Sequence, residues 1–217
     1  MPRAPLIKSD IYPYHITNRS NNKEFFLIDL DLLWEVFCKK LVYLQKELNC
    51  KTHVFVLMSN HYHLIMSTPD RNIGEAMKYL HREVAREANA LVRRENHFFG
   101  GRYKWCIISS EYYYWNAVKY VFRNPIKANL CSKVTDYDFS SLNRSYSGLK
   151  WHGDNIFNET VDMEWDLDWL NKAYDSNQSL SLSKALRRRE FKLPQLRGGY
   201  AVSLDKINQS HKSYEER

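Results

Sequence analysis

The chain has 217 residues, 44% of them apolar, which is enough for one packed domain and an additional segment. No apolar run reaches the roughly 18 residues of a membrane-spanning helix, and the N-terminus lacks the apolar core of a signal peptide, so we expect no membrane partner. The four cysteines form no Cys-x-x-Cys pair, which argues against a zinc knuckle and favours reduced thiols in a cytoplasmic protein.

The excess positive charge is confined to one part of the chain. The formal net charge is +7: residues 1–148 hold 21 Lys and Arg against 14 Asp and Glu, whereas residues 149–217 hold 11 of each. Nucleic acid is a natural partner for such a basic surface, although a modest excess of this size is also common on soluble proteins. We therefore expect a domain at 1–148 and a C-terminal extension at 149–217, partly helical with a mobile tail.

The hydrophobic pattern predicts seven elements in the order βαββαβα. Asp29 or Asp31 is expected to cap the first helix, Asn72 the second and Ser110 the third. This order is typical of an α+β, ferredoxin-like antiparallel sheet with helices on one face. The strands are predicted at 11–20, 52–58, 62–67 and 103–109, and the helices at about 29–48, 73–94 and from 111 onward.

Two histidines, His61 and His63, stand one residue apart between apolar segments. Residues i and i+2 of a strand share a face, roughly 6.5–7 Å apart at Cα, so both imidazoles can converge on one metal ion. A His-x-His pair by itself is more often structural than metal-binding. Of the other histidines, His15 is better explained as a core residue than as part of a site, and His53 as a residue at the surface or edge of the sheet.

The segment 111–130 combines a run of tyrosines with polar residues at helical spacing. In a helix, Tyr113, Tyr120 and Asn124 would share one face, where a phenol could be a nucleophile and an amide oxygen a hard metal ligand. Pro125 disfavours helical geometry at Asn124, so that residue is expected at the helix end. On spacing alone, packing of Tyr120 in an interface is the simpler explanation, and Tyr113 is a rival nucleophile.

Five short blocks, in the expected order over residues 10–142, resemble the single-tyrosine HUH transposases, and most closely the REP-associated tyrosine transposases. Two positions depart from the family's pattern, Ser59 for proline and Phe139 for tryptophan, and neither supplies the chemistry. The blocks are Tyr14–Ser20 (the family's YHVTNRG), Met58–Leu64 (MPNHVHLL), Gly101–Lys104 (GRYK), Tyr120–Ala128 (YIHLNPVRA) and Phe139–Ser141 (WSS).

The resemblance implies a metal-dependent endonuclease and strand transferase acting on single-stranded, hairpin-containing DNA. Tyr120 would be the catalytic nucleophile that forms a 5′-phosphotyrosine, and Asn124 stands where the family carries a third polar metal ligand beside His61 and His63. The implied ion is Mg²⁺ or Mn²⁺, although imidazoles on softness alone would favour zinc, nickel or copper. Eight basic residues are candidate DNA contacts, or else solvated surface charge: Arg19, Arg102, Lys104, Arg123, Lys127, Arg187, Arg188 and Arg189.

Two other classes of function remain open on the sequence. A non-catalytic, domesticated relative could bind single-stranded nucleic acid without cutting it, and a ferredoxin-like domain could stack RNA bases on sheet aromatics. The intact His61, His63 and Tyr120 argue against the first, and the lack of a Gly-Phe-Gly-Phe pattern argues against the second. In the extension, residues 187–189 are expected to contact DNA or to dock against the acidic stretch 159–168. Both a monomer and a homodimer are compatible with the sequence.

Overall fold

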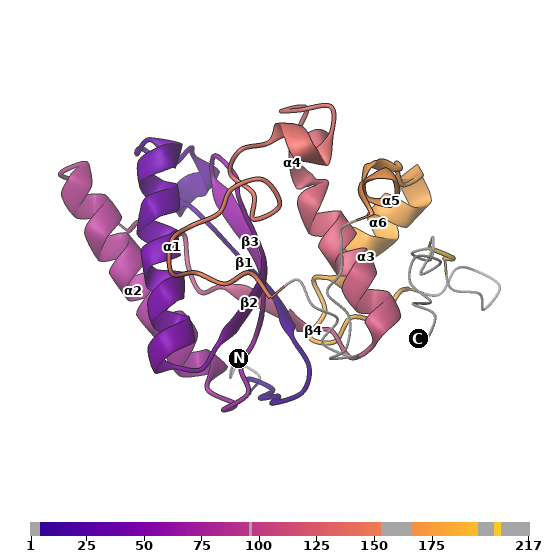
Figure 1. The fold of residues 1–217 in the computed structure, drawn as a ribbon, viewed down its shortest axis with the longest axis horizontal. Helices are drawn as coiled ribbons and strands as arrows, with labels where there is room; N and C mark the ends of the chain where they lie inside the picture. Colours follow the sequence, from indigo (N-terminus) through magenta and orange to yellow (C-terminus); the bar gives the residue numbers. More distant parts are fainter. Residues whose placement is uncertain (1–4, 96, 153–165, 195–201, 205–217) are drawn as a thin grey trace, which may run out of the picture.

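A four-stranded antiparallel sheet forms the centre of the computed structural model, which describes residues 5–95, 97–152, 166–194 and 202–204 (Figure 1). The strand order β2-β3-β1-β4 places β3 and β1 in the middle. The α+β class and the predicted order of elements are confirmed. Within the described ranges, no helix is both long and apolar enough to cross a bilayer. The strands are β1 (Tyr14–Arg19), β2 (Lys51–Leu57), β3 (His61–Ser67) and β4 (Lys104–Ile107).

The three predicted helices form close to their expected bounds. Asp29 caps the first and Ser110 the third, each by accepting hydrogen bonds from backbone N–H groups of the first turn. Asn72 precedes the second helix, but its side chain makes no capping bond and donates instead to the Leu48 carbonyl. The described helices are α1 (Leu30–Glu47), α2 (Ile73–Leu91), α3 (Glu111–Phe122), α4 (Asn124–Lys127), α5 (Leu167–Asn171) and α6 (Ser176–Ala185), with 3-10 turns at Asn21–Lys23 and Val134–Asp136.

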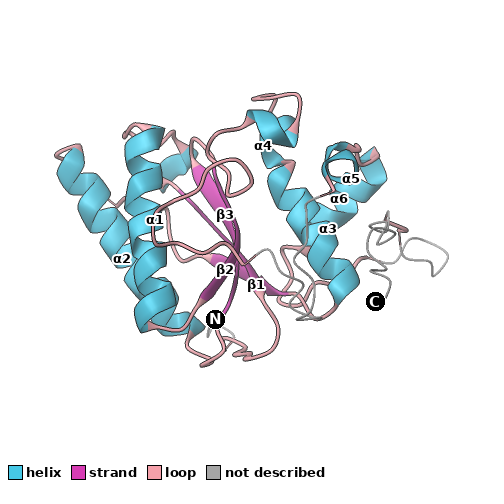
Figure 2. Ribbon diagram, viewed as in Figure 1, coloured by secondary structure: helices cyan, strands magenta, loops and turns pink. Residues whose placement is uncertain are grey.

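Helices cover both faces of the sheet, so the expectation that they lie on one face is wrong. The helices α1 and α2 pack on the face that carries Leu64, whereas α3 packs on the opposite face against Ile65 (Figure 2). A strand covered on both faces is buried along its length, and in β3 every residue from Tyr62 to Ser67 is buried, with Leu64–Met66 as its apolar centre. Because side chains alternate along a strand, His61 and His63 lie on the same face of the sheet as Ile65, which is the face covered by α3.

The helix that carries the tyrosines ends where Pro125 predicts. Arg123 is the C-cap of α3, and the chain restarts as α4 at Asn124 with Pro125 in its first turn. Pro125 has no backbone N–H with which to continue the hydrogen bonding of α3 and suits the first turn of a helix, which explains the break even though Asn124 itself begins α4. Asn124 therefore lies just beyond the helix that carries Tyr120.

Both edges of the sheet are covered by the chain itself. Ser140 forms an antiparallel bridge with Val56 on the outer side of β2, and Glu190 forms a parallel bridge with Ile107 on β4. Open strand edges invite pairing with other chains, and these bridges reduce that tendency. The second bridge also ties the C-terminal extension to the sheet.

The described part of the extension packs into the same apolar cluster as α3. Trp169, Leu182 and Phe191 are buried in this cluster. The Lys119 Nζ lies 4.6 Å from the ring centroid of Trp169 and 4.7 Å from that of Tyr174, and such contacts are favourable where water is excluded. The extension therefore shares a core with α3. Most of the acidic stretch and the predicted tail lie outside the described residues.

Truncating Phe191 to alanine is expected to lower the free energy of unfolding by about 3–5 kcal/mol. The ring is fully buried and stacks on Tyr113 with centroids 4.8 Å apart. Denaturant unfolding measures the change. The matched control is Leu180→Ala, because Leu180 is 54% exposed, and its truncation should cost less than about 0.5 kcal/mol. An equally small effect at Phe191 would show that the extension is not part of the core.

Stability should fall as the pH drops below about 6.5, in part because of His53. This residue lies on the edge strand β2 but is buried, and burial lowers its pKa to about 3. Its Nδ1 lies 2.7 Å from the His152 carbonyl oxygen and its Nε2 lies 2.8 Å from the Ser67 hydroxyl, an arrangement that suits the neutral ring. Between these two pH values the unfolded chain binds a proton that the folded chain does not, so stability is lost at up to about 1.4 kcal/mol per pH unit.

Urea unfolding of the wild type and of His53→Leu, from about pH 7 down to about pH 4.5, measures this contribution. The variant should be less stable than the wild type at neutral pH, because the Ser67 hydroxyl and the His152 carbonyl lose their partner. Its stability should also change less with pH. Identical pH slopes for the two proteins would contradict the assignment to His53.

Candidate active site

One cleft of about 700 Å³ brings together the residues that the sequence singled out for chemistry. His61, His63, Tyr120 and Asn124 all line it. Its residues come from β1 and β3, from the loop before β4, from α3 and α4, and from the end of α6. Segments that are far apart in the chain thus contribute to one site.

The alternation of β3 directs both histidines of the pair to the cleft, with ring centroids 5.1 Å apart. His61 is half-buried, and its Nδ1 lies 2.7 Å from the side-chain oxygen of Asn60. An amide oxygen only accepts, so the His61 Nδ1 is the donor and its Nε2 keeps the lone pair that a metal needs. Burial, with a smaller effect of nearby Arg19, lowers the pKa of His61 to about 4, and the ring is therefore neutral at pH 7.

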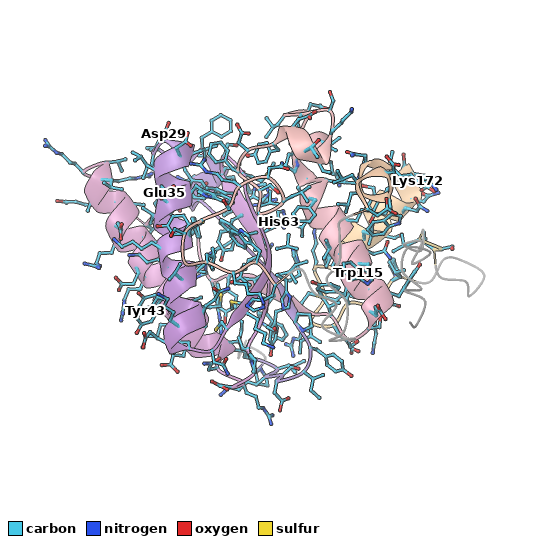
Figure 3. The ribbon with its side chains drawn as sticks, in the orientation of Figure 1. Asp29, Glu35, Tyr43, His63, Trp115 and Lys172 are labelled. Carbon is cyan, nitrogen blue, oxygen red and sulfur yellow. The ribbon has the colours of Figure 1, made fainter. Side chains whose placement is uncertain are left out.

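His63 is buried on the α3 side of the sheet (Figure 3). Its Nδ1 lies 2.9 Å from the Nε2 of His15, while its own Nε2 is buried without a hydrogen-bond partner among the described residues. An unpartnered buried polar atom costs on the order of 1–3 kcal/mol unless something else satisfies it. Burial, His15, His61 and Arg19 lower the pKa of His63, so its ring is neutral and able to bind a metal.

The helix α3 presents Tyr120 to the histidine pair. The ring centroid of Tyr120 lies 6.1 Å from that of His63, and the two planes are nearly perpendicular at 85°. Asn124 donates from its Nδ2 to the Tyr120 carbonyl at 2.8 Å, which leaves the amide oxygen as its available group. Tyr113 does not line the cleft and stacks on Phe191 instead.

These residues fit a divalent metal with open coordination positions. Two neutral imidazole nitrogens and one amide oxygen are suitable ligands, and the unpartnered Nε2 of His63 is a site that an ion would satisfy. The described residues contain no group of three or more His, Cys, Asp or Glu that would form a closed site. An open site leaves room for water and substrate oxygens, as hard ions such as Mg²⁺ and Mn²⁺ require.

Four of the eight basic residues that were predicted to contact DNA line the cleft. Arg123 and Lys127 instead line a second pocket of about 180 Å³, which Tyr120 also lines. Arg188 and Arg189 line neither of these two pockets. The cleft-lining residues are Arg19, Arg102, Lys104 and Arg187.

The extension supplies part of the cleft that sequence reasoning did not foresee. Ser183 and Leu186, at the end of α6, line the cleft. Arg123, predicted as a DNA contact, donates to the carbonyls of Leu170 and Asn171 and so ties α5 to the end of α3. Leu182 and Leu186 are four residues apart in the sequence, which predicts a buried face on α6. The spacing does not identify the surface that this face covers.

Comparison with solved structures supports the fold. The chain is similar to a REP-associated tyrosine transposase whose structure is bound to a REP hairpin, with a TM-score of 0.57 and 15% sequence identity over 77% of this chain and 96% of that chain. It is also aligned with a putative transposase from Deinococcus radiodurans R1, at a TM-score of 0.38 and 16% identity over 60% of this chain and 96% of that chain. No protein-family model and no curated protein matches the sequence. The chain shares its fold with the first of these transposases.

Proposed function

We propose that the protein is a metal-dependent endonuclease and strand transferase for single-stranded, hairpin-containing DNA, with Tyr120 as its nucleophile. The observation that carries this proposal is the convergence of His61, His63, Tyr120 and Asn124 on one basic cleft. Packing alone does not require two neutral imidazoles, a perpendicular phenol and a free amide oxygen in one place. The hairpin bound to the structurally similar transposase gives the substrate class its support.

The chemistry follows from the position of the phenol. The Tyr120 oxygen attacks a backbone phosphorus, a tyrosyl O–P bond forms, and the bond from phosphorus to the 3′ oxygen breaks. The phenol proton is released to water, and the leaving 3′ oxygen takes up a proton to become a free hydroxyl. The 5′-phosphotyrosine conserves the energy of the phosphodiester, so attack by another 3′-hydroxyl rejoins strands without a nucleotide cofactor. Alignment of the attacking and leaving oxygens is the contribution that a rigid helix such as α3 can make.

The remaining cleft residues neutralise and orient the substrate. His61, His63 and Asn124 would hold the divalent ion, which when bound polarises the scissile phosphate and stabilises developing negative charge. Arg19, Arg102, Lys104 and Arg187 would contact backbone phosphates on either side of the cleavage point, since all four line the cleft. Arg123 and Lys127 would contact the strand at the adjoining pocket, and Arg188 and Arg189 would have a smaller, electrostatic effect.

Binding should favour single strands and imperfect hairpins over blunt duplex and should weaken steeply with salt. In Arg102→Gln/Lys104→Gln the slope of log affinity against log salt should become shallower by about 1.4, because each lost phosphate contact on a single strand is worth roughly 0.7. Fluorescence anisotropy of a labelled hairpin at several salt concentrations measures this.

The control pair for this slope is Lys46→Gln/Lys78→Gln. Both lysines are exposed, and they lie on α1 and α2, which cover the opposite face of the sheet. Their removal should lower affinity only slightly and leave the difference between hairpin and duplex unchanged. Equal affinity for blunt duplex at matched salt, or equal slopes for the two double variants, would contradict the assigned surface.

The function is tested by incubating the protein with a labelled single-stranded hairpin and Mn²⁺ and separating the products under denaturing conditions. We expect a band in which labelled DNA migrates with the protein, absent when EDTA is present. DNA binding without any covalent band, across a panel of hairpins and with either Mg²⁺ or Mn²⁺, would favour a non-catalytic binding protein.

A further inference from the structure

His15 and His63 form a hydrogen-bonded histidine pair across the two central strands. His63 lies opposite Thr17, so His15 is its diagonal neighbour on the same face of the sheet. The planes of the two rings are 20° apart, their centroids are 5.1 Å apart, and the His15 Nε2 lies 2.9 Å from the His63 Nδ1. His15 is only 3% exposed, yet it lines the cleft.

Only one proton can lie between these two nitrogens, so one ring donates and the other accepts. If His15 donates, the neutral His63 carries its proton on Nε2, which is buried without an acceptor among the described residues. If His63 donates from Nδ1, its Nε2 carries a lone pair instead. Only the second arrangement allows His63 to bind a metal through Nε2.

We propose that His15 is a positioning residue, which accepts the Nδ1–H of His63 and thereby fixes the tautomer and ring angle that present the Nε2 of His63 to the metal. This inference rests on the proposed metal site. In this role His15 is not a metal ligand, because its Nε2 accepts from His63 and the neutral ring then carries its own proton on Nδ1.

The other histidine of the pair has an equivalent partner, which supports this role. His61 donates from Nδ1 to the side-chain oxygen of Asn60 at 2.7 Å, just as His63 donates to His15. Each imidazole is therefore held by one side-chain acceptor on the nitrogen that faces away from the metal. A partner of this kind raises the basicity of the ligand and holds its orientation, and its loss commonly weakens metal affinity 10–100-fold.

The test compares His15→Gln with His15→Leu in the full-length protein. Glutamine places an amide oxygen near the position of the His15 Nε2 and can accept from His63, whereas leucine fills a similar volume without an acceptor. Calorimetric titration with Mn²⁺ should give an affinity within about threefold of the wild type for His15→Gln and 10–100-fold weaker binding for His15→Leu. Circular dichroism and thermal unfolding establish that each variant is folded.

A spectroscopic count of metal-bound nitrogens separates positioning from coordination. Pulsed EPR of the Mn²⁺-loaded wild type and of His15→Gln should detect the same two imidazole nitrogens. The loss of one nitrogen in the variant would overturn the proposal, because His15 would then be a ligand.

If His15→Leu does not fold, the ¹⁵N NMR spectrum of the Zn²⁺-loaded wild type provides the test. A protonated Nδ1 on His63 supports the proposal, and a deprotonated Nδ1 overturns it. Normal Mn²⁺ affinity in His15→Leu overturns the role of His15 alone, whereas no Mn²⁺ binding by the wild type overturns the metal site as well.

Discussion

Replacing Tyr120 with phenylalanine should abolish covalent attachment to DNA, reducing the cleavage rate by at least about a thousandfold, while hairpin binding changes less than about threefold. The substitution removes the attacking oxygen but keeps the ring that stands against His63. The protein should therefore fold normally and keep its affinity, because phosphate contacts supply most of that affinity. Cleavage of a labelled hairpin and anisotropy of the same DNA measure the two effects.

The matched control is Tyr113→Phe, which removes an equivalent hydroxyl seven residues earlier on the same helix. Tyr113 stacks on Phe191 and does not line the cleft. This variant should form the adduct at close to the wild-type rate. Adduct formation lost in Tyr113→Phe but retained in Tyr120→Phe would move the nucleophile to Tyr113.

Replacing His63 with alanine should weaken Mn²⁺ binding more than about 100-fold, which exceeds the usual effect of removing a hydrogen-bond partner of a ligand. Cleavage should fall with metal occupancy, because the ion stabilises charge on the phosphate. Hairpin affinity should be largely retained, since the basic residues of the cleft are unchanged. Calorimetry with Mn²⁺, single-turnover cleavage and anisotropy separate these three quantities.

His97→Ala is the control for this substitution. His97 is exposed, lies between α2 and β4, and does not line the cleft. Its removal should change none of the three quantities by more than about twofold. Full cleavage by His63→Ala, or full activity of the wild type in EDTA, would contradict the metal assignment.

Short-range rules predicted much of the site. The alternation of a strand was enough to place His61 and His63 on one face, and both line the same cleft. Pro125 was enough to predict that α3 ends near Asn124, although Asn124 itself begins the short helix α4. In both cases the decisive interactions lie within a few residues of each other in the sequence.

The features that the sequence did not predict depend on contacts between distant segments. The apolar run of β3 is compatible with helices on either face, so nothing local assigned α3 to the face opposite α1. His15 is buried, as expected of a core histidine, but its contact with His63 was not predicted because the two residues lie 48 positions apart. The contribution of α6 to the cleft has the same origin, because an apolar helix face does not specify the surface that it covers.

We propose that Tyr120 forms the covalent bond to DNA. The most direct test is mass spectrometry of the protein after reaction with a single-stranded hairpin and Mn²⁺, nuclease trimming and proteolysis. We expect one phosphonucleotide-modified peptide, with the modification on Tyr120 and a 5′ linkage to the DNA. A modified peptide that maps to residues 111–119, or the absence of any modified peptide under conditions in which the DNA is cut, would contradict it.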